Sequence, residues 1–376
     1  MIKLVSDTID KSDINSLIEW LSQDEIPQLT KGPLTVQLEK KWAEKIGTKH
    51  SVFVNSGSSA ILLTLAALRE AGYLKNQNIV VPALSWATDV SSPMLLDMNV
   101  FLCDCNLHDL SVDLKKLEHI FKKYSPSAFI LVSPLGLIPD MKKIVELCDK
   151  YNVYLLEDVC ESMGSMTDGK YLGSFGKASM FSTYFGHHIS TIEGGFINTN
   201  DSRLNDYLLM MRSHGWTRDL PNKKDTKPTF TSLYKFEVPG FNLRSTDLQA
   251  FLGIRAIDKL DGFVQKRQEN FFLYNKLLEI NLLNIYINPE DVISNFAYPV
   301  VIKNRKKVVQ KLRENGVEVR PLIAGNMATQ PMWKYFDTPE MTNAKLIDKY
   351  GFYLPNHHDL TEEEITMICG IINNTK

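Results

Sequence analysis

Short apolar runs alternate with amphipathic segments through the first 200 residues of the chain. Apolar runs bounded by polar or turn-forming residues predict strands at 79–82, 100–103, 128–133, 153–157, 179–182 and 195–198. Between them, apolar residues that recur every three or four positions predict helices over 58–70, 113–123 and 141–152. Nearly continuous apolar strands separated by helices are typical of a mostly parallel sheet that helices cover on both faces. In such sheets the ligand lies at the carboxyl ends of the strands.

The pattern changes after residue 200, where long helical periodicities replace the alternation. Helices are predicted over 245–259 and 263–281, followed by a strand at 297–302 and helices at 306–314 and 361–373. We therefore expect a large domain over residues 1–250 and a smaller C-terminal α+β domain over residues 251–376. The N-terminal helix is a candidate to pack on the smaller domain.

Composition narrows the class of protein. The 376 residues are 44% hydrophobic and 23% charged, with a net charge of −2, which gives no electrostatic reason to bind nucleic acid or an anionic membrane. No apolar run approaches ~18 residues, and the N-terminus has no apolar signal core. Five scattered cysteines fit reduced thiols better than a disulfide framework. We expect a cytoplasmic protein without a membrane span.

The sequence offers no metal site. Cys103 and Cys105 are the only close pair of cysteines, and no further soft ligand follows them at a suitable spacing. The eight histidines show no HExxH spacing. We therefore expect neither a metal ion nor an iron–sulfur cluster, and we read the cysteine pair as small residues at a strand end.

Polar or aromatic residues follow several predicted strands. Asn55-Ser56-Gly57-Ser58 precedes a helix, where small residues either cap the helix or leave amides free for a phosphate. Trp86 either packs in the core or stacks on a planar ligand. Asp158 ends a buried strand, where it either caps a helix or holds a protonated pyridine nitrogen.

The segment FSTYFGHHISTIEGG, residues 181–195, places two histidines in mainly apolar surroundings. An imidazole moves protons near neutral pH. A further motif, Pro239-Gly-Phe-Asn-Leu-Arg244, precedes the next helix and is a turn when read alone.

Taken in order, these motifs resemble the sugar aminotransferase family of fold-type I pyridoxal-phosphate enzymes (DegT/StrS type), over nearly the whole chain. That family shows Ser-x₄-Lys before Glu-Gly-Gly, and here His187 stands five residues after Ser182, where the cofactor-binding lysine is expected. The resemblance implies an aspartate-aminotransferase-like α/β fold, with a mostly parallel seven-stranded sheet between helices and a smaller C-terminal α+β domain. It also implies a homodimer.

The resemblance carries roles onto individual residues. It implies that His187 is the catalytic base, with His188 the alternative. The family's cofactor contacts fall on seven residues: Gly57, Ser58 and Ser182 at the phosphate, Asn242 at a phosphate across the dimer, Trp86 stacked on the ring, Asp158 at the ring nitrogen, and Glu161 at the ring hydroxyl. Weaker candidates for binding glutamate or the sugar nucleotide are His214, Arg218 and Arg244.

Histidine in place of lysine changes the expected reaction, because imidazole cannot hold an aldehyde as a stable imine. The resemblance narrows to sugar 3-dehydratases that use L-glutamate to convert pyridoxal phosphate to pyridoxamine phosphate, with release of 2-oxoglutarate. They remove the C3 hydroxyl of a nucleotide-linked 4-keto-6-deoxyhexose, by resemblance GDP-4-keto-6-deoxy-D-mannose, and release ammonia. The products are colitose-type 3,6-dideoxysugars of lipopolysaccharide O-antigens. Other histidine-bearing relatives use an iron–sulfur cluster, for which the cysteines here supply no ligand set.

Two alternatives stay open at this point. An ordinary nucleotide-sugar aminotransferase needs another lysine at the cofactor, and Lys177 is the nearest upstream candidate. A non-catalytic cofactor-binding homologue would also tolerate the loss of the lysine.

Overall fold

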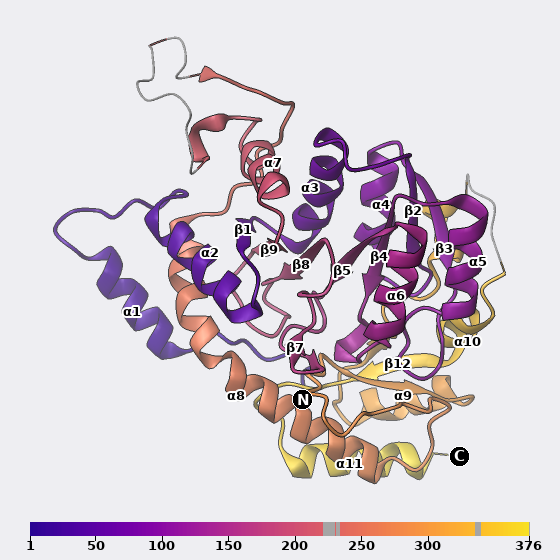
Figure 1. Ribbon diagram of the computed structural model, residues 1–376. Coiled ribbons are helices and arrows are strands. Elements are labelled where there is room, and N and C mark those ends of the chain that lie inside the picture. The colour runs from indigo at the N-terminus through magenta and orange to yellow at the C-terminus, as the bar shows by residue number, and fades with distance from the viewer. Residues whose placement is uncertain (221–229, 231–233, 335–339, 376) are drawn as a thin grey trace.

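A seven-stranded sheet forms the centre of the molecule in the computed structural model, which describes residues 1–220, 230, 234–334 and 340–375 (Figure 1). The order is β1-β9-β8-β5-β4-β2-β3, and only β9 runs against the others. The mostly parallel sheet and all six predicted strands are confirmed. The strands are β1 (His50–Val54), β2 (Asn78–Pro82), β3 (Asn99–Cys103), β4 (Ala128–Val132), β5 (Tyr154–Asp158), β8 (Ala178–Ser182) and β9 (Gly195–Thr199).

Helices cover both faces of this sheet, because its strands present apolar side chains on both sides. One face packs against α3 (Gly57–Glu70), α4 (Ala87–Leu95) and α7 (Ser202–Arg212). The other packs against α2 (Pro33–Ile46), α5 (Leu114–Tyr124), α6 (Met141–Tyr151) and the first half of α8. Neighbouring strand residues alternate between the two cores: Ile130 belongs to the first, Phe129 and Leu131 to the second.

A single 31-residue helix, α8 (Asp247–Leu277), replaces the two helices predicted over 245–259 and 263–281. The predicted break was wrong because Gly262 lies at an exposed position of the helix, where a Cβ would meet nothing within 4 Å. A glycine there costs only about 1 kcal/mol relative to alanine and does not end the helix. None of the described helices is both long and apolar enough to span a bilayer.

The C-terminal part is built on a three-stranded antiparallel sheet of order β10-β12-β11. It comprises β10 (Tyr298–Val301), α9 (Arg305–Glu314), β11 (Arg320–Pro321), α10 (Thr342–Tyr350), β12 (Gly351–Leu354) and α11 (Glu362–Asn373). Shorter elements are the hairpin β6 (Met166–Thr167) and β7 (Lys170–Tyr171), and the 3₁₀ turns η1 (Pro134–Gly136), η2 (Thr217–Asp219), η4 (Met327–Thr329) and η5 (Pro331–Trp333). Helix α8 belongs to both parts of the molecule, because its first half packs on α2 and its second half on α11. The division into two domains near residue 250 therefore stays a proposal.

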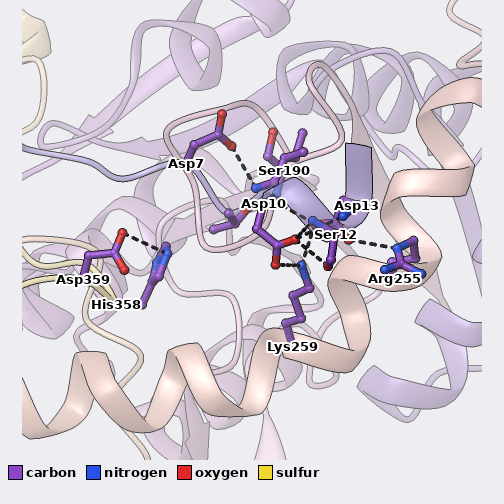
Figure 2. A network of polar contacts seen from close by, with 11 residues as sticks. Asp7, Asp10, Ser12, Asp13, Ser190, Arg255, Lys259, His358 and Asp359 are labelled. Carbon is purple, nitrogen blue, oxygen red and sulfur yellow. Dashed lines mark hydrogen bonds and ion pairs between the residues drawn. The ribbon is translucent and has the colours of Figure 1, made fainter. Parts of the chain in front are cut away.

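The N-terminal segment ties distant parts of the chain together (Figure 2). Ile2 bridges to Val317, and the Thr8 hydroxyl accepts a hydrogen bond from the Ser190 amide at 2.8 Å. Helix α1 (Lys11–Leu21) then packs on α8, where the Lys259 ammonium lies 2.6 Å from the Asp10 carboxylate and 2.5 Å from that of Asp13. The hydrogen bond from Lys259 holds the pKa of Asp10 well below its usual range.

We expect Trp42→Ala to lower the free energy of unfolding by ~3–5 kcal/mol, since it would leave a large cavity in a packed core. Trp42 is fully buried, with its ring 5.1 Å from Phe196 and 5.2 Å from Phe181. Chemical denaturation measures the change. Trp20→Ala is the matched control, because Trp20 is only half-buried and stacks on Phe251 at 4.9 Å; an equal loss in both variants would contradict the assignment of the core.

Candidate active site

A cavity of about 420 Å³ opens at the carboxyl ends of the parallel strands, where the sheet pattern predicts a ligand site. Its lining residues follow β1, β2, β5 and β8 in the chain, and strands β11 and β12 close it from the C-terminal part. The polar and aromatic side chains in its wall, with Gly57, are those of Ser56, Ser58, Trp86, Thr88, Asp158, Cys160, Glu161, Ser182, His187, Phe296, Arg320 and Tyr353, among others. The N-terminal residues Leu4 and Val5 complete the wall.

One end of the cavity is suited to a phosphate. Ser56 caps α3: its Oγ accepts from the Ser59 amide and its carbonyl from the Ala60 amide, both at 3.0 Å. The amides of Gly57 and Ser58 have no such bond to the described residues and lie at the positive end of the helix dipole. A Cβ on Gly57 would come within 2.8 Å of the Ser182 Cβ, so glycine lets the helix end approach the Ser182 side chain.

Asp158 lies in the cavity wall at the end of β5. Its side chain is largely buried, and Oδ1 accepts a hydrogen bond from the Cys160 amide at 2.9 Å. Burial raises the pKa of Asp158, and no lysine or arginine of the described residues pairs with it. A buried carboxylate without a cation fits a ligand that brings its own positive charge, as a pyridinium nitrogen does.

Two further residues fit a planar, hydroxylated ring. Trp86 follows β2 and lines the cavity with its side chain 57% exposed, so a ring face is free for stacking. Glu161 accepts from the Leu135 amide at 3.0 Å, and burial raises the pKa of Glu161 to about 7. Since its carboxyl group can hold or release a proton near neutral pH, it can share a proton with a ring hydroxyl. These residues therefore fit pyridoxal or pyridoxamine phosphate.

His187 is placed as a general base. It lies in the loop after β8, and its Nδ1 is 2.7 Å from the Cys160 carbonyl oxygen. Because a carbonyl only accepts, the proton is on Nδ1 and the lone pair of Nε2 is free. Burial lowers the pKa of His187 to about 4, although the bond to Cys160 acts in the opposite direction. The imidazole is therefore neutral at pH 7.

His188 occupies a different environment. It is fully buried, it does not line the cavity, and its Nε2 lies 2.9 Å from the Ser294 carbonyl oxygen. Phe296 contacts both histidine rings, at centroid distances of 5.3 Å for His187 and 5.9 Å for His188. Of the two histidines, only His187 is in reach of a molecule bound in the cavity.

Comparison with known proteins decides the family. The sequence profile of the DegT/DnrJ/EryC1/StrS aminotransferase family matches residues 7–373. The chain belongs to this family. It is 34% identical, over 98% of its length and 97% of the relative's, to a GDP-4-keto-6-deoxy-D-mannose 3-dehydratase from Yersinia pseudotuberculosis.

Solved structures agree with the fold of this family. A GDP-4-keto-6-deoxymannose-3-dehydratase with a trapped PLP-glutamate geminal diamine superposes with a TM-score of 0.91 and 30% identity, over 99% of this chain and 100% of that one. A mutant of such a dehydratase with bound GDP-perosamine gives a TM-score of 0.89 at 30% identity, with the same coverage. The aminotransferase-like fold is thereby confirmed.

Four residues that the family resemblance nominated lie outside the cavity: Asn242, His214, Arg218 and Arg244. The Arg218 guanidinium stacks on Trp216, 4.1 Å from the ring centroid, and Arg244 donates to the Ser213 hydroxyl at 2.9 Å. The exposed residues His214 and Asn242 belong to adjacent segments, since the His214 amide donates to the Phe241 carbonyl. Within one subunit these four residues do not line the cavity, and their roles stay predictions.

Segment 242–244 nevertheless runs beside the phosphate end of the cavity. The Asn55 amide donates to the Leu243 carbonyl at 3.1 Å, and Val54 bridges to Arg244. Asn242 therefore lies on the surface, next to residues that pair with the chain leading into α3.

Sequence reasoning missed several lining residues, among them Thr88, Arg320 and Tyr353. Thr88 donates to or accepts from the Ser58 hydroxyl at 2.9 Å, and its position two residues after Trp86 was a usable signal. Arg320 lies on a two-residue strand far along the chain, beside Glu318 at 3.2 Å. No periodicity marks so short a strand, so only the folded chain reveals it.

The described residues contain no cluster of three or more potential metal ligands. All five cysteines are free in the structure, and burial raises the pKa of the Cys103 and Cys105 thiols.

In the cofactor-free protein, we expect His187 to be neutral, with its proton on Nδ1, down to about pH 5.5, where an ordinary histidine is mostly charged. Burial is the reason, as it disfavours the imidazolium. Two-dimensional ¹⁵N NMR of histidine-labelled protein, assigned with His187→Gln, measures both tautomer and charge. His188 should show the opposite tautomer because its Nε2 donates to Ser294. A charged His187 at this pH would contradict the assignment of the base.

Proposed function

We propose that this chain is a pyridoxamine-phosphate-dependent sugar 3-dehydratase. It removes the C3 hydroxyl of a nucleotide-linked 4-keto-6-deoxyhexose, by likeness to its relatives GDP-4-keto-6-deoxy-D-mannose, for the synthesis of colitose-type 3,6-dideoxysugars of O-antigens. L-Glutamate is the amino donor, and 2-oxoglutarate and ammonia are released. The observation that carries the proposal is the cavity itself: His187 stands in its wall, and none of the described lining residues is a lysine.

Different cavity residues bind different parts of the cofactor. The amides of Gly57 and Ser58 and the Ser182 hydroxyl hold the phosphate at the N-terminus of α3. Asp158 keeps the ring nitrogen protonated, Trp86 stacks on the ring, and Glu161 bonds to the ring hydroxyl.

His187 moves the proton on which the elimination depends. When bound, pyridoxamine phosphate supplies the amine that condenses with the C4 ketone and a protonated ring that accepts electron density. The free Nε2 of His187 would accept the proton released at the cofactor's C4′ and could return it to the departing C3 hydroxyl, which would then leave as water. The hydrogen bond from Nδ1 to the Cys160 carbonyl fixes the tautomer before the transfer and keeps the ring oriented after it.

The rival reactions find less support. Lys177, the candidate for an aminotransferase lysine, is paired with Asp201, lies 4.2 Å from the Tyr73 ring centroid and does not line the cavity. A non-catalytic module would have no need for a neutral imidazole in the same cavity as the Asp158 carboxyl group.

The position of Asn242 supports a homodimer in which this residue reaches the phosphate of the partner's site. It is exposed, it forms an isolated β-bridge with Ser213, and the next residue accepts a hydrogen bond from the chain that leads into α3. We assign His214, Arg218 and Arg244, on the same surface, to glutamate or the sugar nucleotide of the partner's site. We place the protein in the cytoplasm, where its nucleotide-sugar substrate would be made.

Borohydride treatment of the pyridoxal-phosphate-loaded protein should add no mass to the intact chain, because an imidazole forms no reducible imine. Glutamate should convert the bound cofactor to pyridoxamine phosphate and yield 2-oxoglutarate. The His187→Lys variant is the matched control: it should gain the mass of one reduced cofactor and transfer nitrogen to the sugar. A reducible adduct on a lysine of the wild-type chain would establish the aminotransferase instead.

Mixed dimers test whether Asn242 acts across subunits. His187→Asn and Asn242→Ala should each remove most dehydratase activity when homodimeric. Equal mixing and reassembly should restore about one quarter of the wild-type activity, since half of the dimers then contain one intact site of two. No recovery, although mass spectrometry shows mixed dimers, would mean that Asn242 acts within its own subunit.

A further inference from the structure

A second buried carboxyl group, that of Asp89, interacts with Asp158 although it does not line the cavity. Asp89 is in the first turn of α4 and is fully buried. Its Oδ2 accepts a hydrogen bond from the Trp86 amide at 3.1 Å. Its Oδ1 is buried without a conventional donor among the described residues, and the side chain is hydrogen-bonded to that of Asp158.

Two carboxyl groups in contact away from water cannot both be ionised, because like charges repel strongly at low dielectric. One of them therefore holds a proton, and it lies between the two. The Cys160 amide donates to Asp158 at 2.9 Å, which favours Asp158 as the anion. The titratable groups that face Asp89 are Asp158, Cys160 and Glu161, none of them a cation. Burial first, and then the charge of Asp158, raise the pKa of Asp89 well above its usual value.

We propose that Asp89 is a positioning residue of the cofactor site: a carboxylic acid that donates its proton to Asp158 and holds the turn carrying Trp86. The inference rests on the proposed function, in which Asp158 and Trp86 contact the cofactor. Asp89 then contacts both Asp158, which pairs with the ring nitrogen, and the turn that carries Trp86, which stacks on the ring. The pair carries a single negative charge, which one pyridinium nitrogen balances.

Two substitutions of Asp89 test whether it acts as a hydrogen-bond donor to Asp158. Asp89→Asn keeps an acceptor for the Trp86 amide and supplies an N–H donor for Asp158, whereas Asp89→Ala removes both. We expect cofactor-free Asp89→Asn protein to bind pyridoxamine phosphate with nearly the wild-type Kd. Asp89→Ala should bind at least about tenfold more weakly, the usual effect of losing a hydrogen bond to a charged group. Absorbance titration measures both. Wild-type affinity in Asp89→Ala, or equal weakening in the two variants, would overturn the proposal.

The stability of the cofactor-free protein tests the proton directly. A group whose pKa is higher in the folded than in the unfolded state stabilises the fold while it is protonated. This contribution is lost as pH rises from the unfolded-state pKa towards the folded-state pKa. Wild type should therefore lose stability relative to Asp89→Asn as pH rises from about 4 towards 8. We expect the Tm difference to grow by at least about 2 °C over this window. A constant or shrinking difference would show that Asp89 is ionised.

Asp104→Asn is the matched control for this series. Asp104 is equally buried but has a cationic partner, Lys116, at 2.7 Å. Its replacement should destabilise the protein throughout the window. Failure of the wild-type chain to bind pyridoxamine phosphate would overturn the proposed function and the cofactor role of Asp89 with it. The denaturation series would still decide whether Asp89 holds a proton, so the two failures remain distinguishable.

Discussion

The pairing of β5 with β8 is the constraint on which the site depends. Their parallel register places Asp158 opposite Met180, so both strands end at the same edge of the sheet. The chain leaving β5 supplies Asp158, Cys160 and Glu161, and the chain leaving β8 supplies Ser182 and His187. The hydrogen bond from His187 to the Cys160 carbonyl connects the segments that follow β8 and β5, and it sets the tautomer of the base.

Exclusion of water from this edge gives the site its chemistry. The same burial that raises the pKa values of Asp158 and Glu161 lowers that of His187. All three shifts arise because burial disfavours the ionised form of each group. Asp158 stays the anion of its pair with Asp89 because the Cys160 amide donates to it, and a bound pyridinium brings the positive charge that this carboxylate needs. Affinity for the cofactor and readiness of the base therefore share one physical origin.

One residue separates this chain from the expected pattern of its family. A lysine at position 187 would tether the cofactor and favour transfer of nitrogen, whereas histidine can only accept and return protons. The surrounding residues need no change to serve either reaction, because they bind the phosphate and the ring. This explains why the scaffold is retained while the proposed reaction becomes an elimination.

Local pattern determined a large part of the structure. Apolar runs and helical periodicities located six of the seven strands of the main sheet, and residues such as Gly57, Asp158 and His187 stood at element ends, where a parallel sheet collects them. The same local signals missed β1 and split α8 at an exposed glycine.

Only the tertiary structure decided the remainder. It separated His187 from its neighbour, kept the Asn242 segment outside the cavity, brought in Arg320 and paired Asp89 with Asp158. These outcomes depend on which distant segments meet and which groups lose water. Periodicity along the sequence shows on which face of a helix or strand a residue lies. It does not show which side chain of another element that residue will contact.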